Sequence, residues 1–452
     1  MGDLAESWEI PNDTTYVFHL RKGVKWHNKE PVNGRELVAE DIKFTIEHML
    51  ASQHEYRDMF ATVSKIECPD KYTVKITLKE PLAPFMTFCG SDFSWILAKE
   101  VADKHGDYKL WQTAVGTGPF MLKDYVSGSK AIYVRNPDYF KKGLPYLDQI
   151  DELIIPDEST RLAAMRAGGL HTPTSYSNEI ARTEVAALKK TNPELVHFDW
   201  YRASSYAIFY RTDLKPFNDV RVRRAVSLAI DRKKWVDSVL LGHGVDQSGP
   251  CTAAFSEWWL PTDQLGDAAK WVKYDPEQAK KLLAEAGYPN GLDTVLATTN
   301  GYGVAHIEQG ELINDFLNKV GIRTKMKVVE YAAYTSTYGL GKYDEGLFWG
   351  RTTAFTEVDG FLYYCFKSDQ IKNRGHVNDP KVDEMIMKQR RTLDKAERKK
   401  IIDEFTRYVW DQMYYVFCPI EQVAAVWSPK LKNYKPKVSY DVGRRYEIVW
   451  LE

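Results

Sequence analysis

The sequence predicts an α/β protein of two or three domains. Its 452 residues exceed the ~100–200 residues of one ordinary domain. Residues 292–350 alternate strand, helix, strand, helix and strand, which is the pattern of a parallel sheet. The first third of the chain has mostly strand-like alternation around one amphipathic helix, which is typical of an α+β block.

The α+β block begins with alternating strands. Residues 15–26 ("TYVFHLRKGVKW") place Tyr16, Phe18 and Leu20 on one face, and residues 71–80 ("KYTVKITLKE") repeat this alternation. Between them, residues 39–50 carry apolar side chains at helical spacing, which predicts a helix packed by Ile42, Ile46, Met49 and Leu50.

Several helices further along have clear start and stop signals. Residues 150–156 predict a strand, and residues 157–169 predict the helix after it. Residues 218–244 predict a helix pair, and residues 445–451 ("RYEIVWL") predict a final strand. Four aspartates precede helical patterns and are expected to cap them: Asp231, Asp275, Asp379 and Asp394.

The parallel sheet is expected at residues 292–300, 322–330 and 343–350, with helices at 304–321 and 331–341. Ligands bind beyond the carboxyl ends of the strands in such sheets. Those ends are Thr299–Gly303, Glu330–Tyr334 and Trp349–Thr353. The stretch "GLFWGRTTAF" at 346–355 is therefore predicted to lie at the same sheet edge as the other two loops.

Composition excludes several classes of protein. Lys plus Arg total 61 and Asp plus Glu total 62, so the net charge of -1 lacks the basic excess of a nucleic-acid binder. No apolar run approaches the ~20 residues that cross a bilayer, and no signal peptide is expected in the opening residues. The cysteines are scattered and are predicted to be small buried side chains: Cys68, Cys89, Cys251, Cys365 and Cys418.

Sequence motifs of enzymes are missing. There is no G-x-S-x-G elbow, no H-E-x-x-H and no phosphate-binding G-x-x-x-x-G-K-[ST] loop. The glycines of "VGTGPF" at 115–120 lack the third glycine of a dinucleotide fingerprint and predict a tight turn. Glu357 and Asp359 are considered as a catalytic pair but are expected to cap or line a loop. We therefore predict no catalysis, no metal site and no cofactor.

Aromatic residues gather at the predicted strand ends, where they suit a concave pocket with few polar anchors. Ordinary core packing is the competing interpretation for each of them. The candidate ligand-binding residues are Trp349, Arg351, Tyr331, Tyr334, Tyr302, Trp258, Tyr206 and Tyr210. Trp349→Ala is expected to weaken ligand binding without loss of cooperative folding.

The chain resembles the extracytoplasmic solute-binding proteins of ABC transporters, family 5, the oligopeptide- and dipeptide-binding group called cluster C. Stretches that span nearly the whole chain carry this resemblance: "LAESWEI", "YVFHLRKGVKWHNKEPVNGRELVAEDIKFTIEHML", "VGTGPFMLKDY", "IYVRNPDYF", "PFNDVRVRRAVSLAIDRKKWVDSVLLGHG", "YDPEQAKKLLAEAGYPNG" and "YYVFCPI". Together they are specific, although no single one would be.

The resemblance implies a periplasmic-binding-protein-like type II fold with two ligand-clasping lobes and an extra α+β domain. The extra domain would be residues 1–115. Lobe I would be discontinuous, residues 116–218 and 421–452, and would carry Tyr206 and Tyr210. The second clasping lobe would be residues 219–420. The lobes would close on the ligand like a hinge, and the permease would recognise the closed form.

Two departures from the family pattern bear on function. Family members usually have a signal peptide and several dozen residues before "LAESW", so the resemblance implies truncation at the N-terminus. In peptide binders, an aspartate three residues after the strand-end tryptophan pairs with the peptide ammonium. Thr352 stands at that position after Trp349. A buried ammonium without a counter-charge costs several kcal/mol.

We therefore expect an extracytoplasmic protein, in the periplasm or anchored at the cell surface, that delivers a peptide or similar small solute to an ABC permease. A non-peptide ligand such as an oligosaccharide, an opine or another anion is the alternative, because Arg351 suits a carboxylate or phosphate. A secreted hydrolase and a sensor without transport are further alternatives. We expect a monomer with no nucleic-acid partner.

Overall fold

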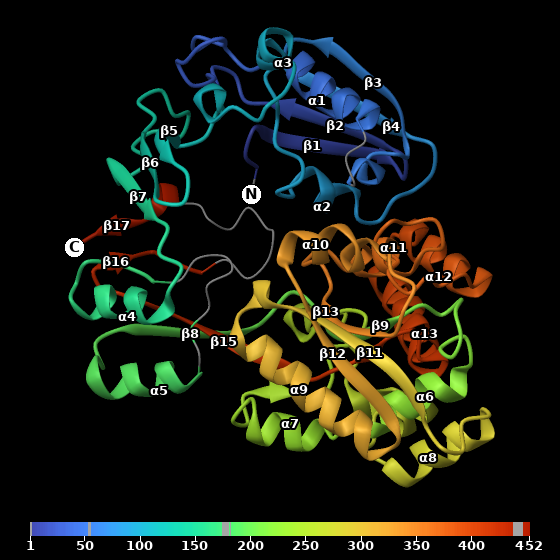
Figure 1. Cartoon of the computed structure of the whole chain (residues 1–452). Coiled ribbons are helices and arrows are strands. Elements are labelled where there is room, and N and C mark those ends of the chain that lie inside the picture. Colours follow the sequence, from blue (N-terminus) through green and yellow to red (C-terminus); the bar gives the residue numbers. More distant parts are fainter. Residues whose placement is uncertain (1, 53–55, 174–179, 181, 437–445) are drawn as a thin grey trace. The chain divides into compact units, whose positions relative to one another are not determined.

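The computed structural model describes residues 2–52, 56–173, 180, 182–436 and 446–452 (Figure 1). The protein chain forms two compact units. Unit 1 contains residues 1–198 and 424–452, and unit 2 contains residues 199–423. The finer predicted boundaries near residues 115 and 218 stay predictions.

Unit 1 begins with a four-stranded antiparallel sheet of order β1-β2-β4-β3. Its strands are β1 (Ala5–Asn12), β2 (Thr15–Leu20), β3 (Val63–Asp70) and β4 (Thr73–Leu78). Helix α1 (Ala39–Ala51) packs on β3 and β4, so the predicted strand–helix–strand block is confirmed. Alternation buries Val74, Ile76 and Leu78 on the side of the sheet that faces the core. Two short helices follow, α2 (Phe85–Cys89) and α3 (Lys99–His105).

A second antiparallel sheet of unit 1 contains β5 (Phe120–Val126), β6 (Lys130–Arg135) and β7 (Gln149–Leu153). The predicted helix after it is α4 (Glu158–Arg166), which Asp157 caps by accepting a hydrogen bond from the Thr160 amide. The predicted final strand over 445–451 is wrong in its extent. The structure has a 3-10 turn at Tyr446–Ile448 and a two-residue strand β17 (Trp450–Leu451) that pairs with β16 (Leu431–Lys432).

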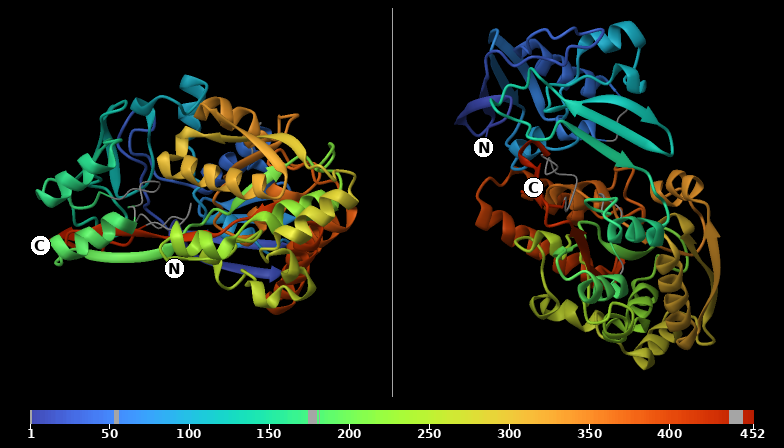
Figure 2. Two further views of the ribbon diagram at one scale, coloured as in Figure 1. Left: turned by 60° about the horizontal axis from the view of Figure 1, so that its bottom comes forward. Right: turned by 90° about the vertical axis from the view of Figure 1, so that its left-hand side faces the viewer.

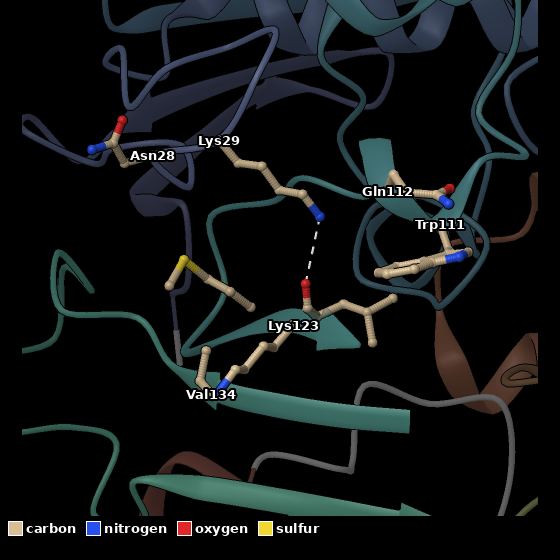
Figure 3. Close-up of a pocket in the computed structure, with 8 residues that line it drawn as sticks. Asn28, Lys29, Trp111, Gln112, Lys123 and Val134 are labelled. Atoms are coloured by element: carbon tan, nitrogen blue, oxygen red, sulfur yellow. Dashed lines mark hydrogen bonds between the residues drawn. The ribbon is translucent and has the colours of Figure 1, made fainter. Parts of the chain in front are cut away.

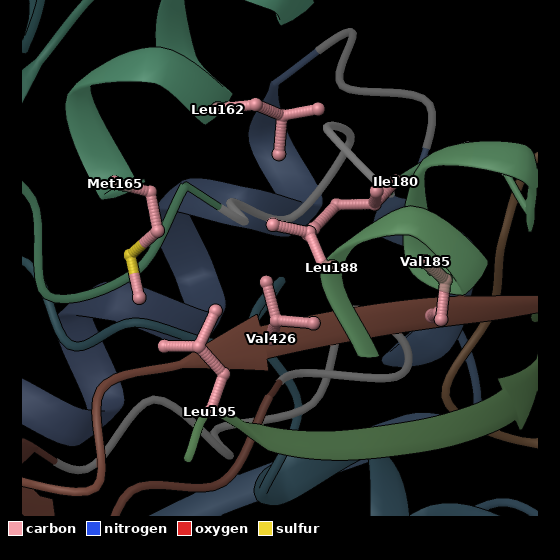
Figure 4. Packing of buried hydrophobic residues seen from close by; sticks show 8 residues of the cluster. Leu162, Met165, Ile180, Val185, Leu188, Leu195 and Val426 are labelled. Atoms are coloured by element: carbon pink, nitrogen blue, oxygen red, sulfur yellow. The ribbon is translucent and has the colours of Figure 1, made fainter. Parts of the chain in front are cut away.

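A hydrophobic cluster joins α4 and α5 (Arg182–Thr191) to the strand β15 (Ile420–Trp427), which returns from far along the chain (Figure 4). Leu162 and Leu188 from the helices and Val426 from β15 are almost completely buried in it. The chain leaves unit 1 within β8 (Val196–Tyr201) and re-enters it within β15. These two strands run side by side in a small sheet with β10 (Gly244–Val245) (Figure 2).

Unit 2 is built on a five-stranded sheet of order β12-β11-β13-β9-β14. The strands β11 (Leu292–Thr299), β12 (Ile322–Val329) and β13 (Leu347–Arg351) are parallel, which confirms the predicted crossovers through α9 (Val304–Lys319) and α10 (Tyr331–Ser336). Helix α9 packs on β11 and β12 (Figure 1). Two strands that the sequence analysis did not place, β9 (Tyr206–Tyr210) and β14 (Val416–Phe417), complete the sheet in antiparallel pairing.

Unit 2 contains six further helices, of which all but α11 lie at predicted positions; the sequence analysis expected a loop around Glu357 and Asp359. These helices are α6 (Val220–Ala229), α7 (Arg232–Ser238), α8 (Pro276–Glu285), α11 (Val358–Phe366), α12 (Pro380–Arg391) and α13 (Lys395–Gln412). The four predicted caps are confirmed, since Asp231, Asp275, Asp379 and Asp394 each accept a hydrogen bond from a first-turn amide.

Candidate ligand-binding site

The three predicted loops lie at one edge of the sheet of unit 2, because β11, β12 and β13 are parallel. Tyr302 follows β11, Tyr331 and Tyr334 lie in α10 after β12, and Arg351 ends β13. Tyr206 lies opposite Arg351 in the antiparallel register with β9. We call these five residues, with Trp349 and His306 beside them, the strand-end group.

Ring contacts join the loops of the strand-end group. The ring centroid of Tyr302 lies 5.5 Å from that of Tyr331 and 6.0 Å from that of Tyr334. The guanidinium carbon of Arg351 lies 4.4 Å from the Tyr302 ring centroid and 5.0 Å from the Tyr206 ring centroid. The cation is therefore held between two tyrosine rings, an arrangement that fixes its position.

Two glycines make this packing possible. A Cβ atom at Gly301 would lie 2.2 Å from the ring of Tyr331, and one at Gly350 would lie 1.9 Å from Oη of Tyr334. A Cβ atom at either position would clash with the tyrosine. The packing of Tyr331 and Tyr334 therefore requires glycine at positions 301 and 350.

Arg351 has no acidic partner within ion-pair distance among the residues that the structure describes, and its Nε atom is buried without a hydrogen-bond partner. Arg374 is a second cation here. Its guanidinium donates to the main-chain carbonyls of Arg351 at 2.5 Å and Gly339 at 3.1 Å, and no described carboxylate pairs with it. Two guanidinium groups, those of Arg351 and Arg374, therefore lie here without a described carboxylate at ion-pair distance, which favours an anionic ligand.

His306, in the first turn of α9, lies behind the tyrosines. Its ring stacks on Trp349 with centroids 5.2 Å apart, and its main-chain carbonyl accepts a hydrogen bond from Nε1 of Trp349 at 3.1 Å. Burial, with the nearby charge of Arg351, lowers the pKa of His306 to about 3. The imidazole is therefore neutral, and neither ring nitrogen has a hydrogen-bond partner among the described residues.

His306 is not among the candidate ligand-binding residues that the sequence predicts. The signal that could have found it is its place directly after the loop at the end of β11.

The hydroxyls of Tyr302 and Tyr334 stay protonated. Burial raises the pKa of Tyr334 to about 12 and raises that of Tyr302 as well. The hydroxyl of Tyr334 is buried and has no hydrogen-bond partner within the described part of the chain. It can therefore serve as a neutral donor.

Two predicted site residues are not brought into the strand-end group. Tyr210 lies at the other end of β9, opposite Leu347, where its hydroxyl donates to the Met413 carbonyl and its ring stacks on Phe217. Trp258 lies against the guanidinium of Arg398, 5.1 Å from its carbon. Both Tyr206 and Tyr210 lie in the sheet of unit 2, and their assignment to lobe I stays a prediction.

Trp349 reaches the group but is completely buried. Its ring packs against Tyr206, Trp235 and His306, so Trp349 supports the other residues of the strand-end group through packing contacts.

Thr352, which stands where the resemblance leads us to expect the aspartate of peptide binders, has a side chain held by a hydrogen bond. Oγ1 of Thr352 accepts a hydrogen bond from the Ser205 amide at 2.8 Å. Glu357 and Asp359, the carboxylates considered as replacements, are paired internally: Glu357 with Arg398 at 2.7 Å and Asp359 with Arg390 at 3.4 Å. Neither is available to an ammonium group.

The described residues lack the features of a metal site and of a membrane span. They contain no group of three His, Cys, Asp or Glu side chains placed to hold a metal ion. None of their helices is both long and apolar enough to span a bilayer. The cysteines are free thiols, and burial raises the pKa of Cys365 to about 11, so this thiol is not a nucleophile at neutral pH.

Residues 1–373 match the family model described as bacterial extracellular solute-binding proteins, family 5 middle. A similar relative is heme-binding protein A of Haemophilus influenzae, 32% identical over 95% of this chain and 81% of the relative. Di/tripeptide-binding protein 2 of Pseudomonas aeruginosa is 29% identical over 91% of this chain and 79% of its own length.

Solved structures show the same fold. The ABC transporter-associated periplasmic binding protein DppA of Helicobacter pylori, in complex with the peptide STSA, matches with a TM-score of 0.85 and 28% identity over 100% of this chain and 89% of its own. The binding protein AgaA of A. tumefaciens R10, in complex with agropinic acid, matches with a TM-score of 0.83 and 26% identity over 99% and 89%. This similarity confirms the predicted type II periplasmic-binding-protein fold.

Proposed function

Because the chain belongs to family 5 of the bacterial extracellular solute-binding proteins, we propose that it captures a small solute outside the cytoplasm and delivers it to an ABC importer. Its homologues are binding proteins, and we propose that this chain likewise binds without catalysis. A peptide is the first ligand class, and an opine-like acid is the second. The monomeric state and the hinge closure stay predictions.

The proposal for the ligand rests on the position of Arg351 and on its lack of a counter-charge. Its guanidinium lies between the rings of Tyr206 and Tyr302, and no described carboxylate neutralises it. We propose that the carboxylate of the ligand does so. Peptides and opines both carry this group, and a charge-assisted hydrogen bond stabilises binding by about 1.5–3 kcal/mol.

The ammonium group of a peptide has less support in the structure than its carboxylate. Thr352 provides no charge, and the nearby carboxylates of Glu357 and Asp359 are already paired. We therefore propose that affinity depends more on the acid end of the ligand than on its amine.

We propose that haem is not the ligand of this chain, although one relative is a haem-binding protein. Haem iron commonly takes a histidine as an axial ligand. His306 is 2% exposed, its ring stacks on Trp349 and both ring nitrogens are buried, so they do not face an open site.

Native mass spectrometry of the purified protein should first identify the ligand class through a solute released on denaturation. Titration calorimetry should then compare a tripeptide with its C-terminal amide. We expect the free acid to bind about 10- to 100-fold more tightly than the amide. Arg351→Gln should weaken binding of the acid by a similar factor and leave the amide unchanged.

The matched control is Arg323→Gln. Arg323 lies near the start of β12 and pairs with Asp293, at the sheet edge opposite the strand-end group. Equal binding of acid and amide by the unmodified protein would contradict the role of Arg351. Failure to bind any peptide, opine or co-purified solute would contradict the proposed function itself.

A further inference from the structure

Unit 1 contains a cavity of about 390 Å³ that the proposed function does not use (Figure 3). The loop after β2, the 3-10 turn Trp111–Thr113, β5 and β6 form its walls. Its volume falls within the ~300–1,000 Å³ of small-molecule sites. The lining residues are Asn28, Lys29, Trp111, Gln112, Met121, Leu122, Lys123 and Val134.

The charged residues that line this cavity are all positive. Lys29 and Lys123 contribute two amines, and no Asp or Glu lies among the lining residues. Within the described part of the chain, no carboxylate lies at ion-pair distance from either amine. An anion that entered the cavity would therefore meet positive charge without competition from an acidic side chain.

Lys29 is held only weakly by the protein. Its Nζ atom donates to the carbonyl oxygens of Leu122 at 3.4 Å and Ala114 at 3.5 Å, near the upper limit for a hydrogen bond. Figure 3 shows the amine reaching across the cavity toward β5. Burial lowers the pKa of Lys29, because its charge has lost water without gaining a counter-ion. A bound anion would supply that counter-ion.

The rest of the cavity suits a flat apolar body. Trp111 is partly exposed, and the Lys29 amine lies 5.9 Å from the centroid of its ring. Met121, Leu122 and Val134 provide apolar surface from β5 and β6. An aromatic ring can therefore stack on Trp111 while an acid group attached to it reaches Lys29.

We propose that this cavity is a second binding site, for a small organic anion with a flat apolar body, in which Lys29 binds the acid group and Trp111 stacks on the ring. All of its residues belong to unit 1, and none of them belongs to the strand-end group. The competing interpretation is that Lys29 only ties its loop to β5.

Fluorine NMR can separate these interpretations with 4-fluorobenzoate as the probe and the neutral 4-fluorobenzamide as its isosteric partner. We expect saturable binding of the benzoate and at least tenfold weaker binding of the amide. Lys29→Met keeps the apolar stem and removes the charge, so it should weaken benzoate binding at least tenfold.

The matched control is Lys142→Met, because Lys142 is exposed and lies outside the cavity. Its benzoate affinity should stay unchanged. Equal affinity for benzoate and benzamide, or unchanged affinity in Lys29→Met, would overturn the proposal.

If Lys29→Met does not fold, the proposal can be tested on the unmodified protein. Amine acetylation, read by mass spectrometry, should slow at Lys29 in the presence of 4-fluorobenzoate and stay constant at Lys142. Equal rates at Lys29 with and without the probe would show that the anion does not reach this amine.

Discussion

His306 sits where protonation is costly. Its ring stacks on Trp349, lies close to the charge of Arg351 and has a pKa near 3, whereas an unfolded histidine titrates near 6.5. The unfolded chain therefore binds more protons than the folded chain between these pH values, so stability falls as the pH falls through this window. The maximum slope for one such group is about 1.4 kcal/mol per pH unit.

His306→Phe should remove this slope and keep the ring stack. We expect its free energy of unfolding to match or exceed that of the unmodified protein at pH 7, because two unpartnered buried nitrogens are lost. The advantage of the variant should grow between pH 6.5 and pH 4. Urea unfolding at several pH values measures this, with the exposed His243→Phe as control. Parallel pH curves for His306→Phe and the unmodified protein would show that His306 is not held neutral.

Some single residues could be placed from the sequence and others could not. Tyr302, Tyr331 and Arg351 follow parallel strands, so their meeting at one edge was predictable from topology alone. Burial of Trp349 was not, because β13 is covered on both faces and its apolar run gives no alternation to distinguish them. Trp349→Ala is now expected to destabilise unit 2 by about 3–5 kcal/mol, so it is a poor test of ligand binding.

At the scale of elements, a buried charged cluster joins three helices of unit 2. Glu357 caps α11 and pairs with Arg398 of α13, while Asp359 of α11 pairs with Arg390 of α12. Gln389 links the two pairs by donating to Asp359 at 2.6 Å and accepting from Arg398 at 3.0 Å. Both carboxylates are therefore engaged in buried ion pairs within unit 2.

Arg398→Met should leave Glu357 buried without its cation and lower the free energy of unfolding of unit 2 by about 3–5 kcal/mol. Adding Glu357→Gln should recover part of this loss, because no unpaired charge then remains. Chemical denaturation of the single and double variants measures both effects. The control is Lys319→Met, which breaks an exposed i,i+4 pair with Asp315 and should cost at most about 0.5 kcal/mol. A double variant less stable than Arg398→Met would contradict this account.

Elements with local signals were predictable, and those fixed by distant partners were not. Asp275 with Pro276 defines the start of α8 from neighbouring residues alone. By contrast, β14 is two residues long and exists only through its pairing with β9, about two hundred residues earlier. No pattern in the sequence around β14 predicts its pairing with β9.

At the scale of the molecule, the two units have separate cores. Ala424 and Val426 belong to the cluster of unit 1, although the residues directly before them belong to unit 2. Val426→Ala should destabilise unit 1 by roughly 1–3 kcal/mol through the cavity it leaves. Hydrogen exchange should then become faster in residues 158–173 and 182–198 and stay unchanged in residues 276–329. Uniformly faster exchange in both units would show that they unfold as one.

The discontinuity of unit 1 also has a consequence for synthesis. The ribosome makes the chain from its N-terminus, so α4 and α5 emerge long before the strand that covers Leu162 and Leu188. The 225 residues of unit 2, from 199 to 423, must be made in between. At about 5–20 residues per second this takes roughly 10–45 s. During that time the nascent chain exposes an unfinished apolar surface, which is where a chaperone would hold it and where aggregation would begin.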